Sequence, residues 1–99
     1  MGYIYCFKNL INKKIYIGKT FRNPNIAYRH YIKEQTRENS LLFNEIKKYG
    51  KENFLFYVIG KFPDEKLNEW QRFYIKKFNS YKDGYGYNIS YETSEDDAK

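Results

Sequence analysis

The polar side chains that could carry chemistry in this sequence are few, and half of them are phenols. They are Tyr5, Tyr16, His30, Tyr31, Gln71 and Asn88. No Ser-His-Asp set, no group of metal-ligating cysteines and no glycine-rich phosphate loop accompanies them, so the common catalytic constellations are excluded. The pKa of an unperturbed tyrosine is about 10. A phenol could therefore act as a base at neutral pH only if a nearby cation or metal ion lowered its pKa.

Basic residues follow the second tyrosine and recur along the first helical pattern. We predict that four of them contact nucleic acid: Lys19, Arg22, Arg29 and Lys33. Lys19, Arg29 and His30 are also the cations that could lower the pKa of a neighbouring phenol.

The positive charge of the chain is concentrated in its body. Residues 1–91 hold 17 basic and 8 acidic residues, a net charge of +9, whereas residues 92–99 add four acids and one lysine. Such an excess favours a polyanionic partner, because each Lys or Arg that docks on a phosphate releases condensed counterions. Nucleic acid is the first candidate, and interleaved aromatic rings that could stack on bases support it. A merely solubilising surface is the alternative.

Three short runs of β-branched and aromatic residues predict the strands that must position these groups. Residues 3–7 and 14–18 are joined by a polar, asparagine-containing loop and should pair antiparallel. A third strand is expected at residues 53–59, bounded by Gly50 and Gly60. Together they predict one small sheet.

Helical patterns fill the rest of the chain. Asn23 offers a cap for a helix from Pro24 to about Lys33, and residues 39–40 can cap a second helix that ends at Gly50.

A third helix opens near Pro63. Gln71 interrupts its apolar positions, which are spaced as a buried stripe: Leu67, Trp70, Tyr74 and Phe78.

The order β-β-α-α-β-α predicts a single α+β domain over residues 1–91, with a three-stranded mixed or antiparallel sheet flanked by helices. Residues 92–99 are expected to form an acidic, disordered tail. The single cysteine, Cys6, excludes an internal disulfide and suits a reducing compartment, where it is expected to be a small buried hydrophobe. No signal peptide or membrane span is expected, and the protein should be soluble and cytoplasmic.

Several motifs resemble those of the GIY-YIG nucleases, in the same order along the chain. Tyr-Ile-Tyr at 3–5 and Tyr-Ile-Gly at 16–18 resemble the paired signature of the family. Residues 42–54 resemble the helix and strand start that follow it, and Phe-Tyr-Ile at 73–75 and Gly-Tyr-Asn at 86–88 resemble later motifs. The resemblance implies hydrolysis of DNA phosphodiester bonds with Mg²⁺ or Mn²⁺, without a small-molecule cofactor or a membrane.

The resemblance also implies roles for single residues. Tyr5 matches the tyrosine held to activate the attacking water, and Tyr16 matches the one that orients that water or the phosphate. His30 and Tyr31 are alternatives for a residue that assists proton transfer. Asn88 matches an asparagine that braces the site through hydrogen bonds.

Two positions depart from the family in ways that should impair catalysis. Ala27 stands where the family has an arginine that neutralises transition-state charge, and Gln71 stands where it has the glutamate that binds the metal ion. Loss of one preorganised charge contact typically costs about 10²–10³ in rate, so turnover should nearly vanish. A natural pseudo-nuclease kept for binding and a deliberate pair of substitutions would both explain these residues.

Other functions and plainer structural roles stay open beside this one. A non-catalytic nucleic-acid-binding module needs only the basic body and its aromatic residues, and a protein-interaction domain is a third possibility. The tyrosines could be ordinary core aromatics. Gln71 could be a hydrogen-bonded core amide, and Asn88 a turn residue after Gly86.

Overall fold

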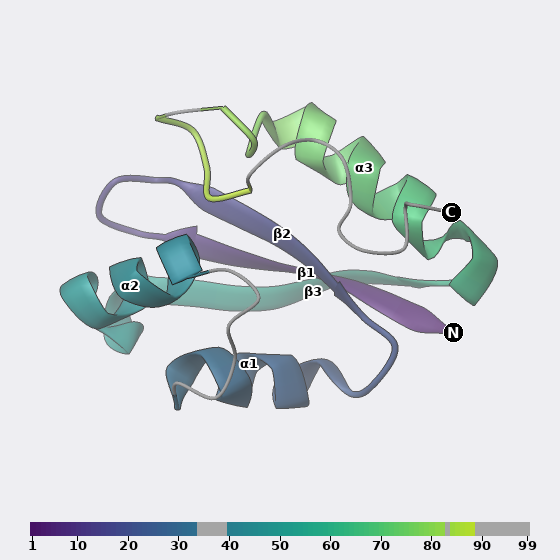
Figure 1. Ribbon diagram of the computed structural model, residues 1–99, viewed down its shortest axis with the longest axis horizontal. Coiled ribbons are helices and arrows are strands. Elements are labelled where there is room, and N and C mark those ends of the chain that lie inside the picture. The colour runs from purple at the N-terminus through teal and green to yellow at the C-terminus, as the bar shows by residue number, and fades with distance from the viewer. Residues whose placement is uncertain (34–39, 83, 89–99) are drawn as a thin grey trace.

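Three strands form one antiparallel sheet in the order β2-β1-β3, as seen in the computed structural model (Figure 1). They are β1 (Gly2–Asn9), β2 (Ile15–Thr20) and β3 (Phe54–Phe62). The structure describes residues 1–33, 40–82 and 84–88. The predicted acidic tail at 92–99 lies outside these residues.

The register of β1 and β2 separates the signature residues into two faces. Tyr5 lies opposite Gly18, and Phe7 lies opposite Tyr16. Because successive side chains of a strand point to opposite faces, these four share one side of the sheet, which we call the tyrosine face. The residues between them point to the other side, which we call the α3 face: Ile4, Cys6 and Ile17.

Helices cover both faces (Figure 1). Helices α1 (Pro24–Ile32) and α2 (Ser40–Tyr49) pack on the tyrosine face, and α3 (Leu67–Phe78) packs on the α3 face. The fold is therefore a small α+β unit with a three-stranded antiparallel sheet, as predicted. None of the helices in the described residues is long and apolar enough to cross a bilayer.

The helix ends follow the capping signals in the sequence. The Asn23 side chain accepts a hydrogen bond from the backbone of Asn25, and Pro24 occupies the first turn of α1. Gly50 follows α2 with a φ of 91°, a conformation that favours glycine. The end of α3 lies at Asn79 in the left-handed conformation, with φ 55°.

Two details of the predicted elements were wrong. Strand β3 continues through Gly60 to Phe62, and the buried positions of α3 are Leu67, Gln71 and Ile75. Trp70, predicted to be buried, has 36% of its surface exposed. The reason is geometric, because consecutive helical residues are about 100° apart and the packed face is centred on Gln71.

Candidate active site at the edge of the sheet

The last described residues cover the outer edge of β2. The N–H of Tyr87 donates to the carbonyl of Ile15 (2.8 Å), and the N–H of Ile15 donates to the carbonyl of Tyr85 (3.2 Å). Gly86 forms a parallel bridge with Ile15. A Cβ at Gly86 would lie 2.2 Å from the Ser80 carbonyl oxygen, so only glycine allows this approach.

Asn88 binds both backbone groups of Ile17, the middle residue of the Tyr-Ile-Gly tripeptide. Its Oδ1 accepts from the Ile17 N–H (2.9 Å), and its Nδ2 donates to the Ile17 carbonyl (3.0 Å). The Ser80 hydroxyl donates to the same Oδ1 at 2.8 Å, and the Asn88 N–H donates to the Ser80 carbonyl at 2.9 Å. Asn88 thereby fixes the backbone that joins Tyr16 to Gly18.

Gln71 reaches the same peptide from α3. Its Nε2 donates to the Ile17 carbonyl at 3.1 Å, and only 6% of the residue is exposed. The amino group faces the carbonyl because the reverse orientation would bring two acceptors together. The other amide atom, Oε1, is buried and has no hydrogen-bond partner among the described residues. A buried acceptor without a partner typically costs about 1–3 kcal/mol in lost solvation.

The Tyr5 ring lies directly over Gly18. A Cβ built at Gly18 would lie 2.3 Å from Tyr5 Cζ and 2.5 Å from its hydroxyl oxygen. Any side chain at position 18 would displace that phenol. The glycine of the second signature tripeptide is therefore explained by the tyrosine of the first.

Three phenols share one aromatic cluster on the tyrosine face. The Tyr16 ring centroid lies 6.3 Å from that of Tyr5 and 6.0 Å from that of Tyr31. Tyr5 and Tyr31 are each 2% exposed, whereas Tyr16 is 9% exposed. Tyr16 is thus the central phenol and the one with the most access to solvent.

Helix α1 turns Ala27 and Tyr31 toward this cluster. Ala27 is half-buried against it and Tyr31 lies within it, as expected for residues four positions apart on one helix face. His30 is half-buried and lies about 100° around the helix from Tyr31. Of the two alternatives for proton transfer, Tyr31 is therefore the one whose ring contacts Tyr16.

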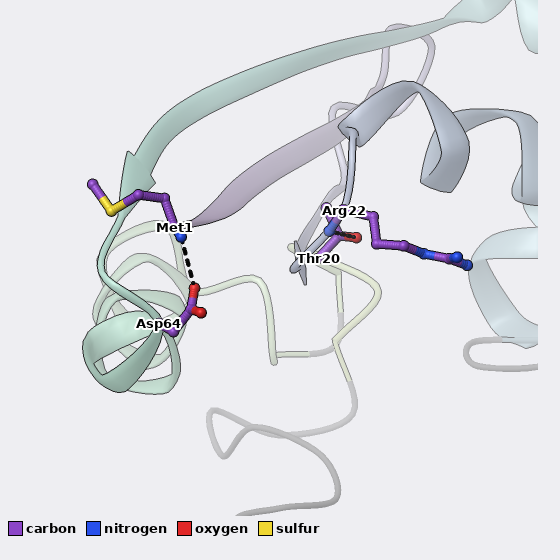
Figure 2. A network of polar contacts seen from close by, with 4 residues as sticks. All are labelled: Met1, Thr20, Arg22 and Asp64. Carbon is purple, nitrogen blue, oxygen red and sulfur yellow. Dashed lines mark hydrogen bonds and ion pairs between the residues drawn. The ribbon is translucent and has the colours of Figure 1, made fainter.

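The predicted nucleic-acid contacts lie on β2, on the loop after it, on α1 and at the end of α1. The Lys19 ammonium contacts the side-chain oxygen of Asn68 on α3. Arg22 is exposed, and its backbone N–H donates to the Thr20 hydroxyl at 3.2 Å while its side chain extends away from the strand end (Figure 2). The other two predicted contacts are also exposed: Arg29 on α1 and Lys33 just after it.

A second polar network, which sequence reasoning missed, anchors the neighbour of Asn88. The Tyr87 hydroxyl accepts from Asn9 Nδ2 (3.0 Å) and donates to Glu45 Oε1 (3.2 Å). Burial raises the pKa of Tyr87, so the phenol stays protonated. The Gly-Tyr-Asn motif was the available signal for this segment, whereas nothing in the sequence distinguished Ser80.

The divalent cation implied by the resemblance does not fit the residues present. Gln71 offers a single neutral oxygen, and that oxygen is buried. Across residues 1–33, 40–82 and 84–88, no three His, Cys, Asp or Glu side chains come together to hold a metal ion. Mg²⁺ is usually bound through one or two carboxylates, and a buried amide oxygen is a poor replacement for them.

Two solved structures share this architecture. The catalytic domain of intron endonuclease I-TevI, as a glutamate-to-alanine mutant, is 28% identical with a TM-score of 0.74, over 94% of this chain and 98% of that one. The catalytic domain of homing endonuclease I-TevI is 26% identical with a TM-score of 0.72, over 91% of this chain and 99% of that one. No protein-family model and no curated protein sequence matches.

The likeness extends beyond the signature tripeptides, since it spans both helical layers and nearly the whole length of each chain. The resemblance read from the motifs is therefore confirmed, and the chain has the fold of the catalytic domain of a GIY-YIG homing endonuclease.

Proposed function

We propose that this chain is a DNA endonuclease domain whose turnover is impaired. The proposed reaction class is hydrolysis of a DNA phosphodiester bond by a tyrosine-activated water. The cation of that reaction class, Mg²⁺ or Mn²⁺, would be held poorly here, because Gln71 stands at the position of the metal ligand. One observation carries the proposal: the chain shares the fold of a homing-endonuclease catalytic domain over 94% of its length. The positive excess of the body supports a polyanionic substrate.

Among the three clustered phenols, the least buried is our candidate for contact with the substrate. Tyr16 is 9% exposed and lies on the edge strand, so its hydroxyl is the candidate for a hydrogen bond to a phosphate or to the attacking water. The Tyr5 ring lies beside the Tyr16 ring and over Gly18. Asn88 and Gln71 act as positioning residues, because both hold the Ile17 peptide and neither is required to touch the phosphate.

Impairment follows from the chemistry of two side chains. Ala27 lies against the tyrosine cluster but supplies no charge to a developing phosphorane. Gln71 uses its amino group on the Ile17 carbonyl and offers only a neutral oxygen. Each missing charge contact typically costs about 10²–10³ in rate.

Restoration of the missing charges tests the proposal. Nicking of supercoiled plasmid with Mg²⁺ or Mn²⁺ should be negligible for this chain and should rise by about 10³ or more in the Ala27→Arg, Gln71→Glu double variant. Ala27→Arg with Gln71→Ala is the matched control, since it restores the cation alone. Adding Tyr16→Phe to the restored variant should abolish the gain.

Folding must be checked in the same experiment. Gln71→Glu places a carboxylate against the Ile17 carbonyl, so the melting temperature of each variant decides whether a missing gain reflects chemistry or unfolding. A folded double variant that binds DNA but does not nick it would contradict the endonuclease proposal.

A non-catalytic nucleic-acid-binding module is the second candidate. It is favoured by the burial of the phenols, since Tyr5 and Tyr31 are each 2% exposed. Both functions require salt-sensitive DNA binding, and affinity alone does not separate them. The folded, binding but inactive double variant described above is the result that would select this function.

A further inference from the structure

The outward side of α3 presents two large aromatic rings to solvent. Trp70 is 36% exposed and Phe73 is 50% exposed, and their ring centroids lie 5.5 Å apart in an edge-to-face arrangement. Contiguous exposed apolar side chains of this size mark interaction surfaces more often than single exposed residues do. Neither ring takes part in the candidate active site.

Both rings are supported from beneath by other aromatics. Trp70 stacks on Phe62 of β3, with ring centroids 4.8 Å apart and an interplanar angle of 22°. Tyr74 lies 5.1 Å from Phe73 and 6.0 Å from Trp70. Rings held this way lose little conformational freedom when a flat ligand binds, which favours stacking.

The charges around the two rings are mostly positive. Lys77 lies 6.0 Å from the centroid of Phe73, and Lys76 is its exposed neighbour. Glu69 is the acid beside Trp70, and it lies 3.9 Å from Lys66, which offsets its charge. This surface therefore combines π faces with a net positive charge.

The acid at the start of the preceding turn is also paired. Asp64 lies 3.1 Å from the N-terminal amine of Met1 (Figure 2). It therefore adds little repulsion toward an anionic ligand that reaches the two rings.

We propose that Trp70, Phe73 and Lys77 form a stacking site for the unpaired bases of single-stranded DNA. Every base has a π face, so aromatic rings beside a lysine accept single strands with little regard to sequence. A protein partner fits less well, because lysine is depleted in the cores of protein–protein interfaces. The inference rests on the proposed function only in taking DNA as the partner.

The outward end of the stacking site lies on the side of α3 opposite to Gln71. Gln71 faces β2, and Phe73, two residues later and about 200° around the helix, is 50% exposed. The path from Tyr16 runs around the β2 edge and past α3, roughly 20 Å for one packed layer and one helix diameter, which is a distance that a few nucleotides span. A single strand leaving a duplex bound at Tyr16 can therefore reach the two rings.

The only tryptophan of the sequence is Trp70, so its fluorescence reports on the site directly. The probes are a 12-nucleotide oligothymidylate and a duplex of equal length, each titrated in EDTA at low salt. The single strand should quench Trp70 fluorescence, and the duplex should quench it much less. Phe73→Ala should weaken single-strand binding about five- to hundred-fold.

Three further variants separate stacking from charge and from folding. Trp70→Phe should keep most of the affinity, measured with a labelled oligonucleotide, while removing the fluorescence signal. Lys77→Ala should lower the slope of log affinity against log salt by about 1. Leu41→Ala is the matched control, because Leu41 is 49% exposed on α2 and should leave the affinity unchanged.

The failure of the stacking site and the failure of the proposed function would give different results. Duplex binding without quenching by the single strand, or single-strand affinity indifferent to Phe73→Ala, would overturn the stacking site and leave the proposed function intact. Absence of any DNA binding at low salt would contradict both the stacking site and the proposed function. Trp70 fluorescence that depends on protein concentration, and loses that dependence in Phe73→Ala, would overturn the inference in favour of an interface between copies.

Discussion

The two faces of the sheet use the same strands for different purposes. On the tyrosine face, Tyr5, Tyr16 and Tyr31 bring three hydroxyl groups into an aromatic cluster. On the α3 face, Ile4 and Ile17 meet the aliphatic side chains of α3.

This difference explains why the signature alternates tyrosine with isoleucine. Ile4 and Ile17 pack against α3, and Tyr5 and Tyr16 thereby point toward α1 and α2. Packing of the sheet against α3 requires the isoleucines, and the alternation of side chains along a strand then sets the position of the phenols. The candidate site lies where the faces meet, at the edge of β2.

Removal of packing from the α3 face should have the largest effect. Ile17 is fully buried, so Ile17→Ala should lower the free energy of unfolding by about 3 kcal/mol through the cavity it leaves. Urea denaturation measures the change. Val58→Ala is the control, since Val58 is 43% exposed on β3, and an equal loss there would contradict the contrast between buried and exposed strand positions.

Overpacking of the tyrosine face should come next. In Gly18→Ala the new methyl group would lie 2.3 Å from Tyr5 Cζ, and we expect a loss of about 2 kcal/mol in the free energy of unfolding.

A double-mutant cycle isolates the clash between these two side chains. In a Tyr5→Leu background, the same Gly18→Ala substitution should cost clearly less, because the ring that it meets is gone. Strictly additive losses would show that Tyr5 is not what excludes a side chain at position 18.

Loss of the edge contact should cost somewhat less. Asn88→Ala removes both hydrogen bonds to Ile17, and we expect a loss of about 1–2 kcal/mol. Asn44→Ala, at an exposed position of α2, should change stability by less than about 0.5 kcal/mol. If thermal denaturation gave the two variants the same stability, Asn88 would not brace the tripeptide.

The smallest effect concerns the thiol of Cys6, which lies on the α3 face with Ile4 and Ile17. Burial raises the pKa of Cys6 from 9.0 to about 11, although a hydrogen bond with Tyr57 opposes the shift. The unfolded thiol ionises near pH 9 while the folded one stays protonated, so this contribution to stability is complete below pH 9 and is lost as pH rises toward 11.

Comparison of two pH values isolates that contribution. Between pH 8 and pH 10 the thiol should account for about 1 kcal/mol of lost stability. Cys6→Ala should show a shallower decline over the same interval, because it lacks the ionising group. Equal declines in the two proteins would mean that Cys6 does not titrate differently on unfolding.

Local signals in the sequence predicted most of the fold. Asn23 and Pro24 located the start of α1, and the glycine at position 50 marked the end of α2. The extension of β3 through Gly60 was missed, because pairing with β1 overrides the local preference of glycine. Trp70 was misplaced because an apolar residue at the margin of a helix stripe looks the same in sequence as one at its centre.

The site could be predicted only as a set of residues, not as an arrangement. The motifs drew attention to Gln71 and Asn88, but their shared partner is a backbone carbonyl, and any residue at position 17 has one. Nothing in the sequence marked Ser80 as a residue of the site. Contacts between a side chain and a distant backbone depend on the folded chain, and local patterns do not contain them.

The hydrogen bonds between Ile17 and Asn88 join residues 71 positions apart in the chain. Because closing a long loop costs more entropy than forming local contacts, we expect this contact to form after the hairpin and the helices. During synthesis the outer edge of β2, the strand that carries Tyr16, stays open until residues 85–88 have left the ribosome. The candidate site is therefore complete only after residues 85–88 have been synthesised.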